Sequence, residues 1–153
     1  MSTYTATIRW TCNGQDFLND RYSRAHDWLF DGGQVVPASA SPHIVPVPNA
    51  VAENVDPEEA FVASLSSCHM LFFLSLAMKR GILVEEYIDE AAGVMAKNSE
   101  GKLAITRVTL RPKARYGNEA PDPEQVERLH HRAHQLCFIA NSVRSEVITE
   151  IIA

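Results

Sequence analysis

The segment from residue 57 to 80 constrains the fold more than any other part of the sequence. Asp56 is a suitable N-cap, Pro57 fits the first helical position, and Glu59 stands where its carboxylate completes a capping box. The segment ends at Lys79-Arg80-Gly81, two basic residues and a glycine that can stop a helix. Most residues between these signals are apolar. We therefore expect a helix at 57–80 that is buried nearly all round and lies at the centre of the fold.

A second helix starts with the same chemistry. Asp122 provides the N-cap, Pro123 the first position, and Gln125 the residue that completes the capping box. Apolar residues then recur at helical spacing: Val126, Leu129, Ala133, Leu136 and Cys137. We expect this helix to end between residues 137 and 140.

The other regular segments are rich in β-forming residues and predict strands: 3–11, 21–30, 87–97, 102–116 and 143–152. Asn13-Gly14 indicates a turn between the first two strands, within a loop longer than two residues. The four prolines of residues 37–48 predict an extended loop. The resulting order, ββ-loop-α-ββ-α-β, predicts an α+β fold with an antiparallel sheet and two long cysteine-bearing helices, in one domain over residues 1–153.

Composition narrows the function classes. The chain has 153 residues, 46% of them apolar, and a formal net charge of −5, which argues against nucleic acid or anionic lipid as the main partner. The longest apolar segment, 62–78, is interrupted by four serines, a cysteine and a histidine, and it suits a buried helix better than a membrane span. The first ten residues have no signal-peptide pattern. We expect a cytosolic protein with no membrane partner and no cofactor.

The three cysteines are Cys12, Cys68 and Cys137. Their odd number, wide spacing and lack of a Cys-x-x-Cys pair argue against a structural disulfide framework in the cytosol. Each is therefore either a small buried residue or part of a redox pair. Neither Cys68 nor Cys137 begins a helix, so a reactive thiolate would need a cation from elsewhere, for which Arg21 and Arg24 are candidates.

The histidines suggest two other functions for the cysteine segments, a metal site and a hydrolase. His130, His134 and Cys137 have the spacing of one helical face and would form a helix-borne metal site, unless they belong to a polar face on which His130 is exposed to solvent. A hydrolase would need a base for Cys68. His69 is its neighbour on the helix and points about 100° away, so it is a poor base for that thiol.

Three segments together resemble the OsmC/Ohr family of thiol peroxidases. Residues 56–68 resemble the helix that carries the first cysteine of the family, and residues 133–142 resemble the segment that carries the second. Residues 22–33 resemble the strand and turn that bear its arginine. The resemblance covers nearly the whole chain. It implies an OsmC-like fold and an intertwined homodimer.

The resemblance also implies roles. Cys68 would be the peroxidatic thiolate that attacks an organic hydroperoxide, and Cys137 the resolving thiol that forms a disulfide with it. Arg24, or as a second choice Arg21, would favour the Cys68 thiolate and orient the peroxide. Glu58 would pair with that arginine, and a dithiol, lipoyl-type reductant would restore the thiols. Ten helical residues span roughly 15 Å, so a site shared by Glu58 and Cys68 would take Glu58 from a partner chain.

Phe138 departs from the family pattern, in which many members have proline after the second cysteine. This departure is typical of an OsmC-like branch, and the preferred hydroperoxide stays open, as does any part played by Cys12. The alternative function is a non-enzymatic redox-sensing or small-molecule-binding module, with an apolar pocket lined by Cys68, Met70 and Phe72.

Overall fold

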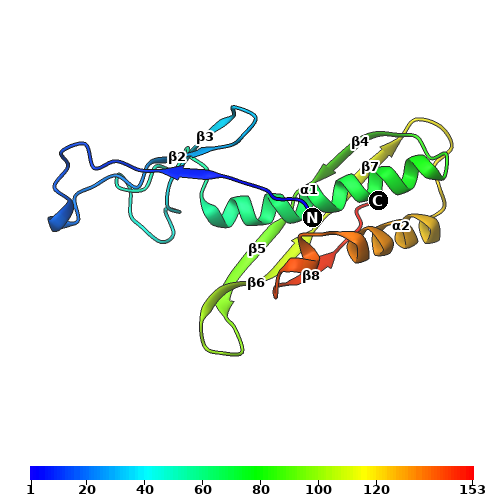
Figure 1. Ribbon diagram of the computed structural model, residues 1–153. Coiled ribbons are helices and arrows are strands. Elements are labelled where there is room, and N and C mark those ends of the chain that lie inside the picture. The colour runs from blue at the N-terminus through cyan, green and yellow to red at the C-terminus, as the bar shows by residue number, and fades with distance from the viewer. The chain divides into compact units, whose positions relative to one another are not determined.

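The computed structural model describes residues 1–153, which fold into two compact units, residues 1–60 and 61–153 (Figure 1). The expectation of a single domain stays an expectation. Both helices and the mixed α+β content agree with the predicted fold class.

The first unit contains a small antiparallel sheet in the order β1-β2-β3. Its strands are β1 (Thr7–Arg9), β2 (His26–Leu29) and β3 (Val35–Ala38). Strands β1 and β2 are shorter than the predicted segments 3–11 and 21–30 in which they lie, and β3 was not predicted. The turn at residues 13–14 opens a long connection that also holds the short 3-10 helix η1 (Phe17–Asn19). Because β2 starts so late, both candidate arginines lie in the connection and not on a strand.

Strand β3 contradicts part of the loop predicted at 37–48. It pairs with β2 through Asp27↔Pro37 and is an edge strand, the place in a sheet that tolerates a proline without a backbone N–H. The buried residues of this unit are small or polar: Ala38, Ser39, Ser41, Ala50 and Asp56. Many of its large apolar side chains are exposed, among them Tyr4, Ile8, Phe17, Leu18 and Val35.

Helix α1 (Pro57–Lys79) has nearly the predicted boundaries. The capping box is confirmed: the Glu59 N–H donates to Asp56 Oδ1 over 2.8 Å, and the Asp56 N–H donates to Glu59 Oε1 over 3.4 Å. Burial all round is wrong. Only one stripe with a four-residue period is buried, consisting of Leu65, His69, Phe73 and Ala77. By length and composition alone α1 could cross a membrane, a test that core helices of soluble proteins also pass.

The second unit pairs its strands in two sheets. Strand β4 (Val84–Asp89) is antiparallel to β7 (Pro112–Tyr116), and β5 (Ala92–Lys97) is antiparallel to β6 (Leu103–Leu110). Strand β8 (Glu146–Thr149) runs parallel to β6, so the prediction of a wholly antiparallel sheet is wrong for this pair. The predicted hairpin with its turn at residues 98–101 is confirmed as β5–β6.

The two predicted strands at 87–97 and 102–116 each divide into two. The divisions lie opposite each other, and there the Asp89 carboxylate accepts the backbone N–H of Arg111 over 2.6 Å. The side-chain bond satisfies a backbone group where the chain passes from one sheet to the other. Pro112 begins β7, a strand position that needs no donor.

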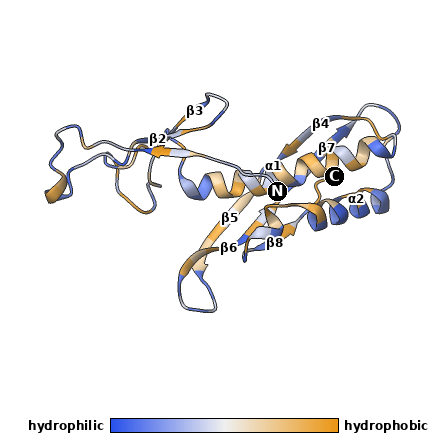
Figure 2. Ribbon diagram, viewed as in Figure 1, coloured by the Kyte–Doolittle hydropathy of each residue, from blue (hydrophilic) through white to orange (hydrophobic).

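Helix α2 (Pro123–Leu136) begins as predicted, with the Gln125 N–H donating to Asp122 Oδ1 over 3.1 Å. It ends at Leu136, one residue before the expected range of 137–140, because Cys137 adopts an extended conformation and caps it. A 3-10 turn, η2 (Ala140–Ser142), follows. Figure 2 shows α1 mostly in hydrophobic colours and α2 with separate hydrophilic and hydrophobic sides. Phe73 of α1 and Leu129 and Ala133 of α2 form one of the two cores of this unit.

Candidate functional site

The thiols of Cys68 and Cys137 come together in the second unit. Cys68 is half-buried in the middle of α1, and Cys137 is 1% exposed at the end of α2. Both are free, and the Cys68 thiol lies close enough to the Cys137 thiol to raise its pKa. The structure therefore brings together two of the predicted site residues, one from within α1 and one from the residue that caps the end of α2.

Burial raises the pKa of the Cys137 thiol, the backbone N–H of Ala140 opposes that rise, and the neighbouring Cys68 thiol reinforces it. The Ala140 nitrogen lies 3.4 Å from the Cys137 sulfur. The net direction is upward, so Cys137 is held as a neutral thiol at neutral pH. A neutral thiol beside a more exposed one suits a residue that reacts second.

An aromatic pair stands beside the thiols. Phe72 lies one helical turn after Cys68, and Phe138 follows Cys137 directly. Their rings meet edge to face, with centroids 5.0 Å apart and an interplanar angle of 78°. Phe138 is 69% exposed and offers apolar surface directly after Cys137.

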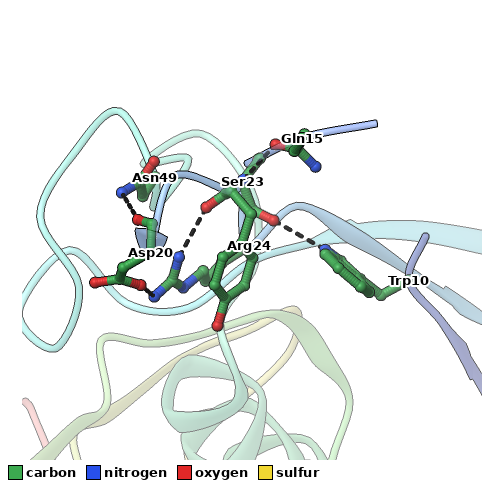
Figure 3. A network of polar contacts seen from close by, with 7 residues as sticks. Trp10, Gln15, Asp20, Ser23, Arg24 and Asn49 are labelled. Carbon is green, nitrogen blue, oxygen red and sulfur yellow. Dashed lines mark hydrogen bonds and ion pairs between the residues drawn. The ribbon is translucent and has the colours of Figure 1, made fainter. Parts of the chain in front are cut away.

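Arg24 is held within the first unit by a network of polar contacts (Figure 3). Its Nη2 donates to Asp20 Oδ1 over 2.7 Å, and its Nη1 donates to the backbone carbonyl of Tyr22 over 2.8 Å. The guanidinium carbon also lies 3.6 Å from the centroid of the Tyr22 ring, a cation–π contact. Arg21 is exposed, and its backbone N–H binds the Asp16 carbonyl. Of the two candidate arginines, Arg24 is the one with a fixed side chain.

The loop around Arg24 is braced from several sides. Asp20 has a left-handed conformation with φ 59°, and its carbonyl accepts from Asn49 Nδ2 over 3.4 Å. The Ser23 carbonyl accepts from Trp10 Nε1 over 2.9 Å, and the Ser23 N–H donates to Gln15 Oε1 over 2.6 Å (Figure 3). These contacts fix the backbone of residues 20–24.

Glu58 lies in the first turn of α1, and its Oε2 is buried with no hydrogen-bond partner. Within the chain Arg24 pairs with Asp20. The predicted pairing of Glu58 with the arginine stays a prediction. An unsatisfied buried carboxylate oxygen is costly, so a donor from outside this chain would stabilise it.

A histidine pair is buried between α1 and α2. His69 Nε2 and His130 Nδ1 are 2.9 Å apart, and the rings are stacked with centroids separated by 5.2 Å. Burial lowers the pKa of His69 to about 4 and that of His130 to about 3, so both rings are neutral at neutral pH. The prediction that His130 faces solvent is wrong, because its ring packs on Phe73 with centroids 4.2 Å apart.

The helix-borne metal site is not formed. No group of three or more histidine, cysteine or acidic side chains is arranged to hold a metal ion. His130 is bound to His69, and Cys137 has left the helix. His69 Nε2 is engaged by His130, so it is not available as a base for Cys68. This agrees with the expectation from helical spacing that His69 is a poor base for that thiol.

Sequence reasoning missed the residues that organise Arg24. Asp20 stands four residues before Arg24. This spacing brings an acidic and a basic side chain together in a helix, but no helix was predicted there, so it did not indicate a contact. Tyr22 belongs to the segment that resembles the family, yet nothing in the sequence marks it as the ring beneath the guanidinium. Both depend on the irregular backbone between β1 and β2.

Solved structures similar to this chain share its fold. An OsmC-like protein of unknown function from Vibrio cholerae is 56% identical with a TM-score of 0.97, covering 99% of this chain and 100% of that one. The organic hydroperoxide resistance protein OhrB of Bacillus subtilis is 22% identical with a TM-score of 0.67, covering 99% and 98%. An organic hydroperoxide resistance protein from Elizabethkingia anophelis is 17% identical with a TM-score of 0.71, covering 99% and 94%.

The curated protein sequences contain no match to this chain. The family described as OsmC-like protein matches residues 51–151, which include α1, α2 and both clustered cysteines. Since that match covers more than half of the chain and two cysteine segments resemble those of the family, the protein belongs to the OsmC-like family.

Proposed function

We propose that this protein is a cytosolic thiol-dependent peroxidase that reduces organic hydroperoxides and serves in oxidative stress. The observation that carries the proposal is the proximity of two free thiols within one chain, since the Cys68 thiol is close enough to Cys137 to raise its pKa. Two neighbouring free thiols can be oxidised to an intramolecular disulfide. The family membership and the names of the two hydroperoxide resistance proteins support the same chemistry.

In the proposed reaction the Cys68 thiolate attacks the terminal oxygen of the hydroperoxide. The O–O bond breaks, the alkoxide leaves and takes a proton to become an alcohol, and Cys68 becomes a sulfenic acid. The Cys137 sulfur then attacks the Cys68 sulfur, the S–O bond breaks, and water leaves as the disulfide forms. A dithiol of the lipoyl type reduces the disulfide by exchange and is itself oxidised.

Arg24 and Glu58 complete the proposed site. The guanidinium of Arg24 would favour the thiolate of Cys68 and bind the hydroperoxide oxygen through its N–H groups. Glu58 would pair with the arginine from a second copy of the chain. Two features support a homodimer: the unsatisfied Glu58 oxygen and the large apolar side chains that the first unit leaves exposed.

The apolar surroundings of the thiols support an organic substrate over hydrogen peroxide. Phe72 and Phe138 give the carbon part of a hydroperoxide an aromatic surface beside Cys68. Apolar surface adds binding energy for an alkyl or aryl chain that hydrogen peroxide lacks.

The test measures consumption of an organic hydroperoxide with a dithiol reductant for the wild type and three serine variants. Cys68→Ser is expected to abolish turnover, and Cys137→Ser to stop it after one equivalent. Cys12→Ser is the matched control, because Cys12 lies in the first unit and its thiol donates to the Gln15 carbonyl. Full activity of Cys68→Ser would contradict the proposal. Oxidation of wild-type thiols without turnover would favour the redox-sensing alternative.

A further inference from the structure

The backbone of Arg24 is held on both sides. Its N–H donates to the Asn49 carbonyl over 2.7 Å, and its own carbonyl lies 2.7 Å from His26 Nδ1. His26 is the first residue of β2, paired with Ala38 of β3. The imidazole therefore ties the carbonyl of Arg24 to the start of the sheet.

The two partners of His26 define where its proton lies. The indole nitrogen of Trp28 is 3.1 Å from His26 Nε2, and an indole N–H can only donate. Nε2 must then accept and carries no proton. The Arg24 carbonyl can only accept, so Nδ1 must carry the proton and donate. Both ring nitrogens are satisfied by one neutral tautomer.

We infer that His26 is a positioning residue for Arg24, a role that rests on the proposed function of Arg24 in the peroxidase site. Three contacts hold the side chain of Arg24, to Asp20, to the Tyr22 carbonyl and to the Tyr22 ring. These contacts come from residues close to Arg24 in the sequence, so they hold the guanidinium in place only if the backbone at Arg24 is itself held in place. The Asn49 carbonyl restrains the N–H of Arg24, His26 restrains its carbonyl, and Trp28 holds the His26 ring in the donating tautomer.

His26 also lines an open cleft of about 620 Å³ in the first unit, together with Arg9 and Asp27. These two side chains are 4.0 Å apart and pair with each other, and both are exposed. The contacts of the His26 ring nitrogens are the Arg24 carbonyl and the Trp28 indole, so its effect on Arg24 runs through the ring proton and not through these charges.

Two substitutions at His26 distinguish the effect of losing the hydrogen-bond donor from the effect of losing the volume of the ring. In His26→Asn the amide nitrogen occupies the place of Nδ1 and can donate to the Arg24 carbonyl, whereas His26→Leu keeps the branching and removes the donor. We expect kcat/KM for an organic hydroperoxide to fall about tenfold in His26→Leu, the effect of one lost restraining hydrogen bond, and to be largely restored in His26→Asn. His43→Leu, at an exposed loop position, is the control and keeps full activity.

The same substitution in an Arg24→Met background shows whether the effect runs through Arg24. We expect His26→Leu to cause no further loss there. An equal loss in both backgrounds, or no loss in the wild-type background while the wild type turns over, would overturn the inference. Absence of turnover in the wild type would instead contradict the proposed function. In that case, or if His26→Leu does not fold, ring nitrogen-15 NMR decides: the neutral Nδ1–H tautomer supports the inference, and any other state of His26 contradicts it.

Discussion

The stacked rings of His69 and His130 share one hydrogen bond that requires one proton between the two facing nitrogens. Adding a second proton would place a charge in a buried site and remove the acceptor. His134 lies close enough to His69 to oppose its charge further, whereas Asp89 favours it. The low pKa values of the pair express this cost, burial being the largest cause for both residues.

This pair should make the protein sensitive to acid. An ordinary histidine has a pKa of 6.5, whereas His69 has a pKa of about 4, so below pH 6.5 the unfolded chain binds protons that the folded chain does not. The free energy of unfolding should therefore be highest above pH 6.5 and fall as the pH drops from 6.5 toward 4. Urea denaturation at pH 7.5, 6 and 5 measures the fall, which should be on the order of a few kcal/mol.

The double variant His69→Leu/His130→Leu should lose most of that pH dependence, because the two titrating groups are gone. His131→Gln is the control: its side chain is exposed, and the variant should keep the wild-type profile. A double variant with an unchanged profile would show that other groups cause the acid sensitivity.

At the scale of elements, the two helices begin with the same capping residues, but the N-cap of α1 is buried and that of α2 is exposed. Asp56 is 5% exposed and takes part in two reciprocal hydrogen bonds with Glu59. Although burial raises the pKa of Asp56, hydrogen bonds from Glu59 and Glu58 outweigh it and leave the pKa below its ordinary value. Asp122 is exposed and accepts one bond from Gln125.

Asp56→Ala should therefore cost more than Asp122→Ala. We expect a loss of about 2 kcal/mol for the first, at the upper end for a cap, and about 1 kcal/mol for the second. Thermal or urea unfolding monitored by circular dichroism gives both values. Equal losses would mean that burial and the second bond add nothing at Asp56.

The sequence predicted those parts of the fold whose causes are local. Caps fixed both helix starts because each depends on residues within one turn of the other, and the β5–β6 hairpin followed from one turn. The four strands β4–β7 were merged into two, because the break depends on Asp89 reaching Arg111 across the fold. The burial of His130 was missed for the same reason, since its partner lies on another helix.

The candidate site shows the same division. Cys68, Cys137 and Arg24 could be selected from their flanking motifs, and the structure brings the two cysteines together. Asp20 and His26, which hold Arg24, could not be selected, because the path of an irregular connection has no periodic signal.

At the scale of the whole molecule, the proposed homodimer accounts for apolar surface that one chain leaves open. Leu71 and Met78 of α1 are 60% and 65% exposed, and the first unit has no large buried side chain of its own. Sedimentation equilibrium should give a mass of about twice the 17.0 kDa of one chain. A mass of one chain at micromolar concentration would contradict the dimer.

Mixed dimers test whether Glu58 acts across the interface. A chain with Cys68→Ser and a chain with Glu58→Ala should each be inactive or nearly so alone. Co-refolded, they should regain about half of the activity per dimer in the heterodimer, because one site then combines the intact Cys68 of one chain with the intact Glu58 of the other. No recovery would place Glu58 in the site of its own chain or outside it.

The central claim is that Cys68 and Cys137 form a disulfide when Cys68 reduces an organic hydroperoxide. Intact mass before and after one equivalent of hydroperoxide tests it most directly. The wild type should lose two hydrogens, about 2 Da, whereas Cys137→Ser should gain one oxygen, about 16 Da, on Cys68. An unchanged wild-type mass, or a loss of two hydrogens that persists in Cys137→Ser, would contradict the account.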